Sequence, residues 1–247
     1  IISPGINLNT HNFSNNVMSV YLEEIKESNL DKCYLQVGIS TIDIITGEST
    51  VYENYSPTDD YTYGLDEVFR FVQTFIPQEI IIHSVNLSKN KEEIMSYLEL
   101  NNFTVQFNIY EKKHYLKNKF KLKMLEKVYP NTGMLNPVEF IDMERLHFAL
   151  NSFIYLIQFV YEHNENIIEK LNKPKIWENT KYLILSHDSI NQLNITPNKN
   201  YIIQNKKNSL WEILDKTTNS LGKRELKKNL LNPILDMEIL NNRYNTV

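Results

Sequence analysis

Between residues 34 and 110 the spacing of apolar positions changes back and forth between two residues and three to four, which predicts strands separated by helices. The patterns run strand, strand, helix, strand, helix, strand over residues 34–42, 49–52, 64–77, 79–84, 90–102 and 103–110. Thr46, Gly47 and Glu48 form the turn of a hairpin between the first two strands. This order predicts an α/β domain with a mixed sheet over residues 1–111, of which residues 1–32 are a linker leading into it.

From residue 112 to residue 247 the pattern changes to helices only. Apolar residues recur at helical spacing through 142–172, so up to about 45 Å of helix can run before Pro174. A helix of that length is typical of a lever or of a bundle member. The second part of the chain is therefore predicted to be an all-α segment.

The last third contains several helix start signals. A helix is predicted over 181–195, and three short helices are predicted over 209–247. The candidate capping residues are Ser186 or Asp188, then Ser209, then Thr217, Thr218 or Asn219. Pro233 separates the last two helices because proline cannot continue a helix.

Charge gives no global signal about partners. The 247 residues carry a formal net charge of −4, so contact with nucleic acid must come from local patches. Two patches are basic, the run Lys112–Lys123 and the cluster Lys223–Lys228. A charge run usually faces water, so we interpret the first as a solvated connection between domains; the alternative is a stand-alone DNA-binding module that uses both patches.

Cysteine content and hydropathy limit the class of protein. The single cysteine, Cys33, excludes an internal disulfide framework and fits a reducing, intracellular compartment. The most apolar stretch, 149–161, is shorter than the roughly 20 residues that a membrane-spanning helix needs. No membrane partner is expected.

The sequence contains no recognisable catalytic motif. Arg224 follows Gly222-Lys223 where a phosphate-binding loop would have a hydroxyl, and the six histidines form no HExxH motif. The strand order is shared with ribonuclease-H-like nucleases, which hold metal ions with carboxylates. The predicted first strand, CYLQVGIST, has no acid, and Asp43 and Glu48 are expected to support the hairpin turn. We therefore assign no catalytic, cofactor-binding or metal-binding residue, and keep the nuclease as an alternative.

Two stretches near the C-terminus carry a resemblance to a known family. LSHDSINQLNI and SLWEILDKTTNSLGKRELKKNLLNP resemble the core domain of the DNA mismatch repair protein MutS. The second stretch matches the family pattern at Ser209, Leu210, Leu214, Asp215, Thr217, Gly222, Arg224, Leu226, Leu230 and Pro233. Upstream, VGISTIDIITGEST looks like the opening of the MutS connector domain, and ILNNRYNTV looks like a later core motif. Asn219 departs from the usual threonine. Lys223, Lys227 and Lys228 fall at variable positions of the pattern, so we expect them to form a solvated face, and we expect Arg224 to make a structural ion pair or a carbonyl contact.

The resemblance implies a connector domain over 1–111 and the N-terminal part of a core domain over 112–247. It implies a relay between mismatch recognition and nucleotide state, a MutL-type partner at the connector, and mismatched duplex DNA bound by the full-length protein. The parent is expected to be a dimeric ATPase that uses ATP and magnesium and acts at DNA, although this segment inherits no catalytic role. Both ends look cut, so we expect a fragment. Abundant Asn, Ile, Lys and Tyr indicate an A/T-rich genome, which suits a large DNA virus or an organelle.

Overall fold

The computed structural model describes most of the chain in seven segments. These are residues 15–26, 33–57, 60–110, 115–163, 165–168, 171–197 and 209–246. They divide into two compact units, which are described separately. The first comprises residues 1–68 and 76–177, and the second comprises residues 69–75 and 178–247.

A six-stranded sheet forms the centre of the first unit. Its strands, in spatial order, are β5 (Thr104–Phe107), β4 (Glu79–Val85), β1 (Asn16–Lys26), β2 (Cys33–Asp43), β3 (Ser49–Tyr55) and β6 (Lys175–Ile176). β1, β2 and β3 are antiparallel neighbours, whereas β4 lies parallel to both β1 and β5. The predicted hairpin is therefore confirmed as β2 and β3, and the strand at 79–84 as β4.

The central strand lies in the segment that the sequence pattern assigned to a linker. β1 pairs along its whole length with β2 and along seven residues with β4, and residues 17–22 are fully buried. The expectation of a linker over 1–32 is thus wrong for residues 16–26, and CYLQVGIST is the second strand. The apolar run of β1 is nearly continuous because both faces of the strand are covered.

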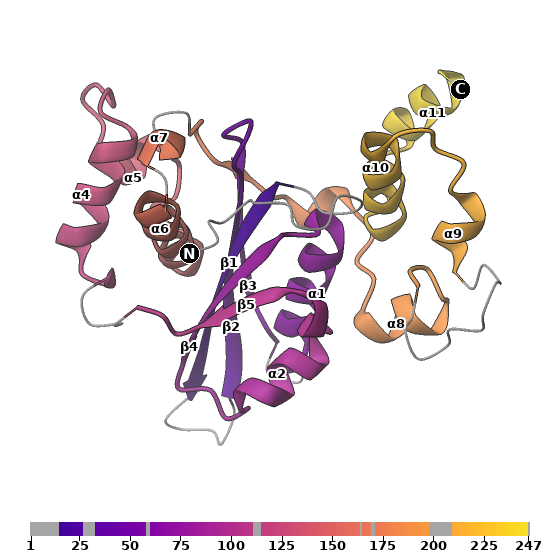
Figure 1. Ribbon diagram of the computed structural model, residues 1–247, viewed down its shortest axis with the longest axis horizontal. Coiled ribbons are helices and arrows are strands. Elements are labelled where there is room, and N and C mark those ends of the chain that lie inside the picture. Colours follow the sequence, from indigo (N-terminus) through magenta and orange to yellow (C-terminus); the bar gives the residue numbers. More distant parts are fainter. Residues whose placement is uncertain are drawn as a thin grey trace. The chain divides into compact units, whose positions relative to one another are not determined.

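Helices cover both faces of this sheet (Figure 1). One face is covered by α6 (His147–His163), which lies with α4 (Asn118–Val128), α5 (Pro137–Phe140) and α7 (Glu165–Ile168). On the other face are α2 (Lys91–Tyr97) and the first half of α1 (Tyr63–Phe75). Successive residues of β2 point to opposite faces of the sheet. Gly38 and Ser40 face α6, whereas Val37 lies beside Gly64 of α1.

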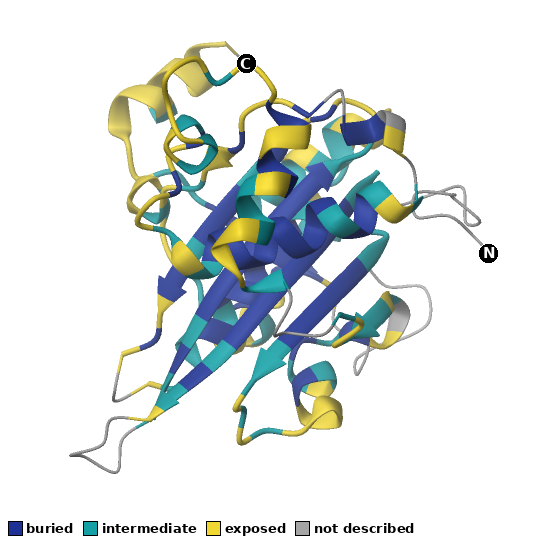
Figure 2. Ribbon diagram, turned by 90° about the vertical axis from the view of Figure 1, so that its left-hand side faces the viewer, coloured by how far each residue is buried: buried dark blue, intermediate teal, exposed yellow. Residues whose placement is uncertain are grey.

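The helix predicted as a lever is instead part of the core of the first unit. α6 has 17 residues, roughly 25 Å, and its buried side chains point in all directions around the helix from Ala149 to Ile157. The Ser152 hydroxyl donates to the Ser19 carbonyl at 2.8 Å and lies 2.9 Å from the Ser40 hydroxyl. Figure 2 shows the strands and α6 in the dark blue of buried residues. A helix apolar on every side is a buried helix.

The first compact unit continues to Trp177, whereas the sequence pattern changed near residue 111. The chain returns to the sheet after α7, where Asn172 N–H donates to the Gly47 carbonyl and Trp177 N–H to the Val51 carbonyl. Between these bonds, β6 adds a parallel strand beside β3. The segment after residue 112 is therefore not helical throughout.

The second unit consists mainly of short helices. They are α8 (His187–Gln192), α9 (Leu210–Leu214), α10 (Ser220–Leu231) and α11 (Met237–Asn245), with a turn of 3-10 helix at Asn179–Lys181. The second half of α1, Phe69–Phe75, belongs to the same unit. Within the described ranges, no helix is long and apolar enough to cross a bilayer.

Candidate functional site

Four acidic side chains lie on or beside the first strands, where a nuclease of this topology would hold metal ions. Asp43 accepts hydrogen bonds from the two N–H groups of the following turn, at 2.9 and 3.2 Å. Glu48 forms an ion pair with Lys175 at 3.0 Å. Asp43 supports the hairpin turn, as the sequence indicated, whereas the Glu48 side chain pairs with a lysine of β6. Glu23 and Glu24 were overlooked because their strand was taken for a linker.

Glu23 and Glu24 also have structural partners. Adjacent residues of a strand face opposite sides, so these two carboxylates point away from each other. Glu24 is buried and accepts hydrogen bonds from Ser88 N–H at 2.7 Å, the Ser88 hydroxyl at 2.6 Å and the Tyr61 hydroxyl at 3.1 Å. Burial alone would raise the pKa of Glu24, but these bonds outweigh it and hold the pKa below its usual value. Glu23 accepts from the Tyr21 hydroxyl at 3.0 Å.

The nuclease alternative therefore lacks its cluster of acids in the part of the chain that the structure describes. No three His, Cys, Asp or Glu side chains converge there in a way that could hold a metal ion. Two-metal catalysis requires such carboxylates to share the ions at close range. The arrangement of these acids stabilises the fold.

Aromatic rings fill the region between β1, β4 and α6. Tyr21 and His83 are register partners on the two strands, and the Tyr155 ring of α6 lies parallel to His83 with 3.7 Å between ring centroids. The Tyr110 ring is nearly parallel to both, with its centroid 5.8 Å from that of His83 and 6.1 Å from that of Tyr155. Burial, together with Tyr115, raises the pKa of Tyr155 to about 12, so its phenol stays neutral. These rings form a packed aromatic cluster between the two strands and α6.

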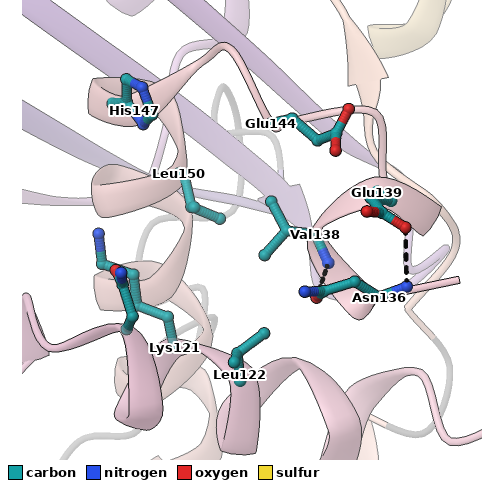
Figure 3. A pocket seen from close by; sticks show the side chains of 9 residues that line it. Lys121, Leu122, Asn136, Val138, Glu139, Glu144, His147 and Leu150 are labelled. Atoms are coloured by element: carbon teal, nitrogen blue, oxygen red, sulfur yellow. Dashed lines mark hydrogen bonds between the residues drawn. The ribbon is translucent and has the colours of Figure 1, made fainter.

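A pocket of about 270 Å³ opens between α4, α5 and α6 (Figure 3). Leu122, Val138 and Leu150 supply apolar lining, and Glu144 and His147 lie on separate parts of the rim. Two further polar lining residues, Asn136 and Glu139, are occupied in the capping box of α5, drawn as dashed lines. The polar groups do not converge on a common point, so the pocket offers no acid–base pair.

The lysines of α4 lie on two sides of the helix, one facing the protein and one facing solvent. Lys121 points inward and donates to the Asn151 side-chain oxygen at 2.5 Å, and burial lowers the pKa of its ammonium. Lys119, Lys123 and Lys127 are exposed on the other side of α4. Residues 111–114 lie outside the described residues. The expectation of a connection between domains is thus wrong for residues 118–123, which belong to α4.

In the second unit, the predicted caps define the helices. Ser186 caps α8, Asn219 caps α10, and Ser209 forms a reciprocal capping box with Glu212 at the start of α9. The Asn219 side chain accepts from Gly222 N–H at 2.7 Å. Asn219 therefore provides the helix start although it departs from the threonine of the pattern that the sequence resembles.

Lysines of α10 that were expected to face solvent are instead bound to neighbouring groups. The ammonium of Lys223 lies 5.1 Å from the Trp211 ring centroid and 3.3 Å from Asp215. Lys227 lies 5.9 Å from the same ring, and burial lowers its pKa to about 8. The Trp211 ring of α9 thus makes cation–π contacts with two lysines of α10. Local spacing in the sequence does not reveal such a tertiary contact.

Arg224 has the role that the sequence suggested for it. Its Nε donates to the Ser220 carbonyl at 3.3 Å, within the first turn of α10. Lys228 makes a long, exposed pair with Glu225 at 3.8 Å, and the side chains of Lys223 and Lys228 are 40% and 42% exposed, so both keep the expected contact with solvent and Lys227 does not.

The second half of α1 is bonded to the C-terminal segment by three side-chain hydrogen bonds, all inside the second unit. They run from Arg70 to Asn179 (2.6 Å), from Lys227 to Gln73 (3.0 Å) and from Asn232 to Thr74 (2.9 Å). Asn232 and Thr74 are both buried. Sequence reasoning missed these residues, because contacts across more than a hundred positions leave no local signal.

Comparison with known proteins gives one family match and many relatives. The family model for MutS domain III matches residues 188–247, which lie in the second unit. A protein of Acanthamoeba polyphaga mimivirus, named as a homolog of the DNA mismatch repair protein mutS, is 33% identical over 258 residues, which cover 95% of this chain and 23% of that protein. DNA mismatch repair proteins MutS of Clostridioides difficile and Methanosarcina barkeri are 24% and 27% identical, over 100% of this chain and 23% and 26% of their own lengths. The chain thus spans about a quarter of the length of these curated relatives.

Proposed function

Because the chain belongs to the MutS family, we propose that it is the part of a DNA mismatch repair protein that relays between mismatch recognition and nucleotide state. In this proposal the first unit is the connector, which we extend to Trp177, and the second unit is the beginning of the core domain. The whole protein would bind mismatched duplex DNA as a dimeric ATPase. No residue of this chain is assigned to ATP, magnesium or catalysis.

One observation carries the relay proposal, namely that α1 belongs to both units. Residues 63–68 of this helix are grouped with the sheet and residues 69–75 with the C-terminal helices. A hydrogen-bonded helix transmits a rotation or shift along its axis because its turns are rigidly connected. The three bonds from its second half would pass such a movement to the core. α6, the helix that the sequence indicated as a lever, is not assigned this role because it is packed against the sheet.

The relay is tested by breaking one of these bonds in the full-length protein. Thr74→Val keeps the shape of the side chain but removes the oxygen that accepts from Asn232. The matched control is Thr218→Val, at an exposed threonine of the same unit. We expect mismatch binding and basal ATP turnover to persist in both variants, whereas the stimulation of turnover by mismatched duplex falls several-fold in Thr74→Val alone. Unchanged stimulation would reject α1 as the relay.

We also propose that a MutL-type partner contacts the first unit. Support comes from a turn before α5, where Met134 is fully exposed and the neighbouring Leu135 is half exposed. Adjacent exposed apolar side chains are typical anchors of protein interfaces. Met134→Asp should weaken binding of the partner at least tenfold in a pull-down titration, whereas Ile45→Asp, at another exposed apolar position of the unit, should not. Equal effects of the two changes would contradict this placement.

A further inference from the structure

The outer face of α4 carries a straight line of positive charge. Lys119, Lys123 and Lys127 follow one another at intervals of four residues, so they share a face of the helix and span about 12 Å along its axis. All three are exposed. Glu126, three residues after Lys123, is the one acidic residue of α4 and is exposed on the same face, so this face carries three positive charges and one negative charge. α4 lies at the left in Figure 1. This line is called the α4 ridge.

Among the described residues, the lysines of the α4 ridge have no acidic partner in an ion pair. They differ in this from Lys173 and Lys175, which pair with Asp142 and Glu48. Lys127 lies 4.6 Å from the Tyr161 ring centroid, a contact that leaves its charge in place. Like charges four residues apart repel each other on a helix, so an external anion that neutralised them would be stabilising.

We propose that the α4 ridge binds the phosphate backbone of duplex DNA. Along the duplex axis, each strand carries one phosphate every 3.4 Å, so a 12 Å line of ammonium groups can contact roughly three phosphates. Lysine ammoniums are compact point charges on flexible stems, which suits contact with a backbone and not the reading of bases. The site is independent of the relay and goes beyond it.

The composition of the ridge favours a polyanion over a protein partner. Protein interfaces are anchored by buried apolar or aromatic side chains, with charged residues depleted at their centre. The exposed large apolar residues of this unit lie elsewhere, and none belongs to α4. Since the chain has a net charge of −4, its overall field cannot produce the binding, and a local line of cations must do so.

The test uses the 247-residue chain and a fluorescein-labelled, fully matched 24-base-pair duplex, with anisotropy measured between 50 and 200 mM KCl. Three phosphate contacts predict a slope of about −2.7 in log K against log salt, which is about a 40-fold loss of affinity over this range. The triple variant Lys119→Gln, Lys123→Gln, Lys127→Gln should lose most binding and flatten the slope. The corresponding three Lys→Arg changes should retain both.

A second triple variant controls for net charge. Lys91→Gln, Lys173→Gln and Lys175→Gln remove three exposed cations from the same unit, so both triple-Gln variants change the net charge from −4 to −7. Unchanged binding by this control supports the ridge, and an equal loss overturns it. Absence of duplex binding by the original chain at 50 mM salt also overturns it. Tighter binding of polyglutamate than of duplex would assign the ridge to an acidic protein and overturn the DNA proposal.

Discussion

A methyl group added at Gly38 should lower the stability of the first unit strongly, because the backbones of β2 and α6 lie in close contact there. A Cβ atom at Gly38 would lie 2.0 Å from the carbonyl oxygen and 2.2 Å from the carbonyl carbon of Phe148, and 2.6 Å from the nitrogen of Ala149. All three atoms belong to the backbone, so no side-chain rotation can relieve the clash. Relief requires a shift of about 1 Å or more between the strand and the helix.

The cost of Gly38→Ala follows from what this shift disturbs. Overpacking of a core costs about 1–3 kcal/mol, occasionally more. The first turn of α6 is also capped by Glu53, whose carboxylate accepts from Phe148 N–H at 2.6 Å and Ala149 N–H at 2.9 Å. Loss of a helix cap costs about 0.5–2 kcal/mol. We therefore expect the free energy of unfolding to fall by about 2–5 kcal/mol.

Urea unfolding checks this prediction, with the two tryptophans as reporters of separate units. Trp177 lies in the first unit and Trp211 in the second, so Trp211→Phe in the background isolates the first. The control is Gly133→Ala, where the added Cβ has no neighbour within 4 Å but φ is +66°, which costs about 1 kcal/mol. A loss for Gly38→Ala no larger than that of the control would refute the close approach of β2 and α6.

Three further changes test the electrostatics. Glu53→Gln keeps one acceptor but loses the charge at the start of α6, and should lower the free energy of unfolding by about 1 kcal/mol in urea. Glu24 has a folded pKa below its unfolded value, so it stabilises the protein above pH ~4.3 and this stability is lost as the pH falls through the folded pKa. Glu24→Gln should therefore flatten the fall of Tm between pH 7 and 3; an unaltered profile contradicts this. The folded pKa of Lys227 is lowered to about 8, so stability should rise between pH 8 and ~10.4. Lys227→Met should abolish that rise in Tm, whereas Lys228→Met should not.

Local signals in the sequence were sufficient for the hairpin, for α1 and for the caps of the C-terminal helices. Ser186, Ser209 and Asn219 could be identified because a capping side chain bonds to N–H groups two or three residues away. β1 could not be identified in this way, since its place at the centre of the sheet is set by pairing with β2 and with β4, some 60 residues away. Two acidic residues were overlooked with it.

The functional surfaces were harder to predict because charge and spacing do not determine burial. Lys121 and Lys119 stand two residues apart in one basic run, yet one donates to Asn151 and the other is exposed. The same holds for Lys227, which local spacing placed in solvent and whose ammonium is buried beside the Trp211 ring. Whether a lysine is buried or exposed depends on how its helix packs against its neighbours. A basic run in the sequence therefore predicts a charged surface only once the position of its helix is known.

The contrast between α6 and α1 bears on how a relay could work in this chain. α6 is the longer helix, but its buried side chains surround it and its first turn is held by the Glu53 carboxylate, so a shift of α6 must break the core of the first unit. α1 is divided between the two units and is likewise buried on all sides over residues 67–72, but polar side chains of its second half, Arg70, Gln73 and Thr74, form hydrogen bonds with Asn179, Lys227 and Asn232. A hydrogen bond contributes a net free energy of about 1 kcal/mol, so exchanging three of them changes the free energy by a few kcal/mol. Binding of DNA or nucleotide by the full-length protein could supply that much and shift the balance between two arrangements. Length and apolar periodicity therefore identify core helices, whereas the proposed relay depends on the polar contacts of α1 that can be exchanged.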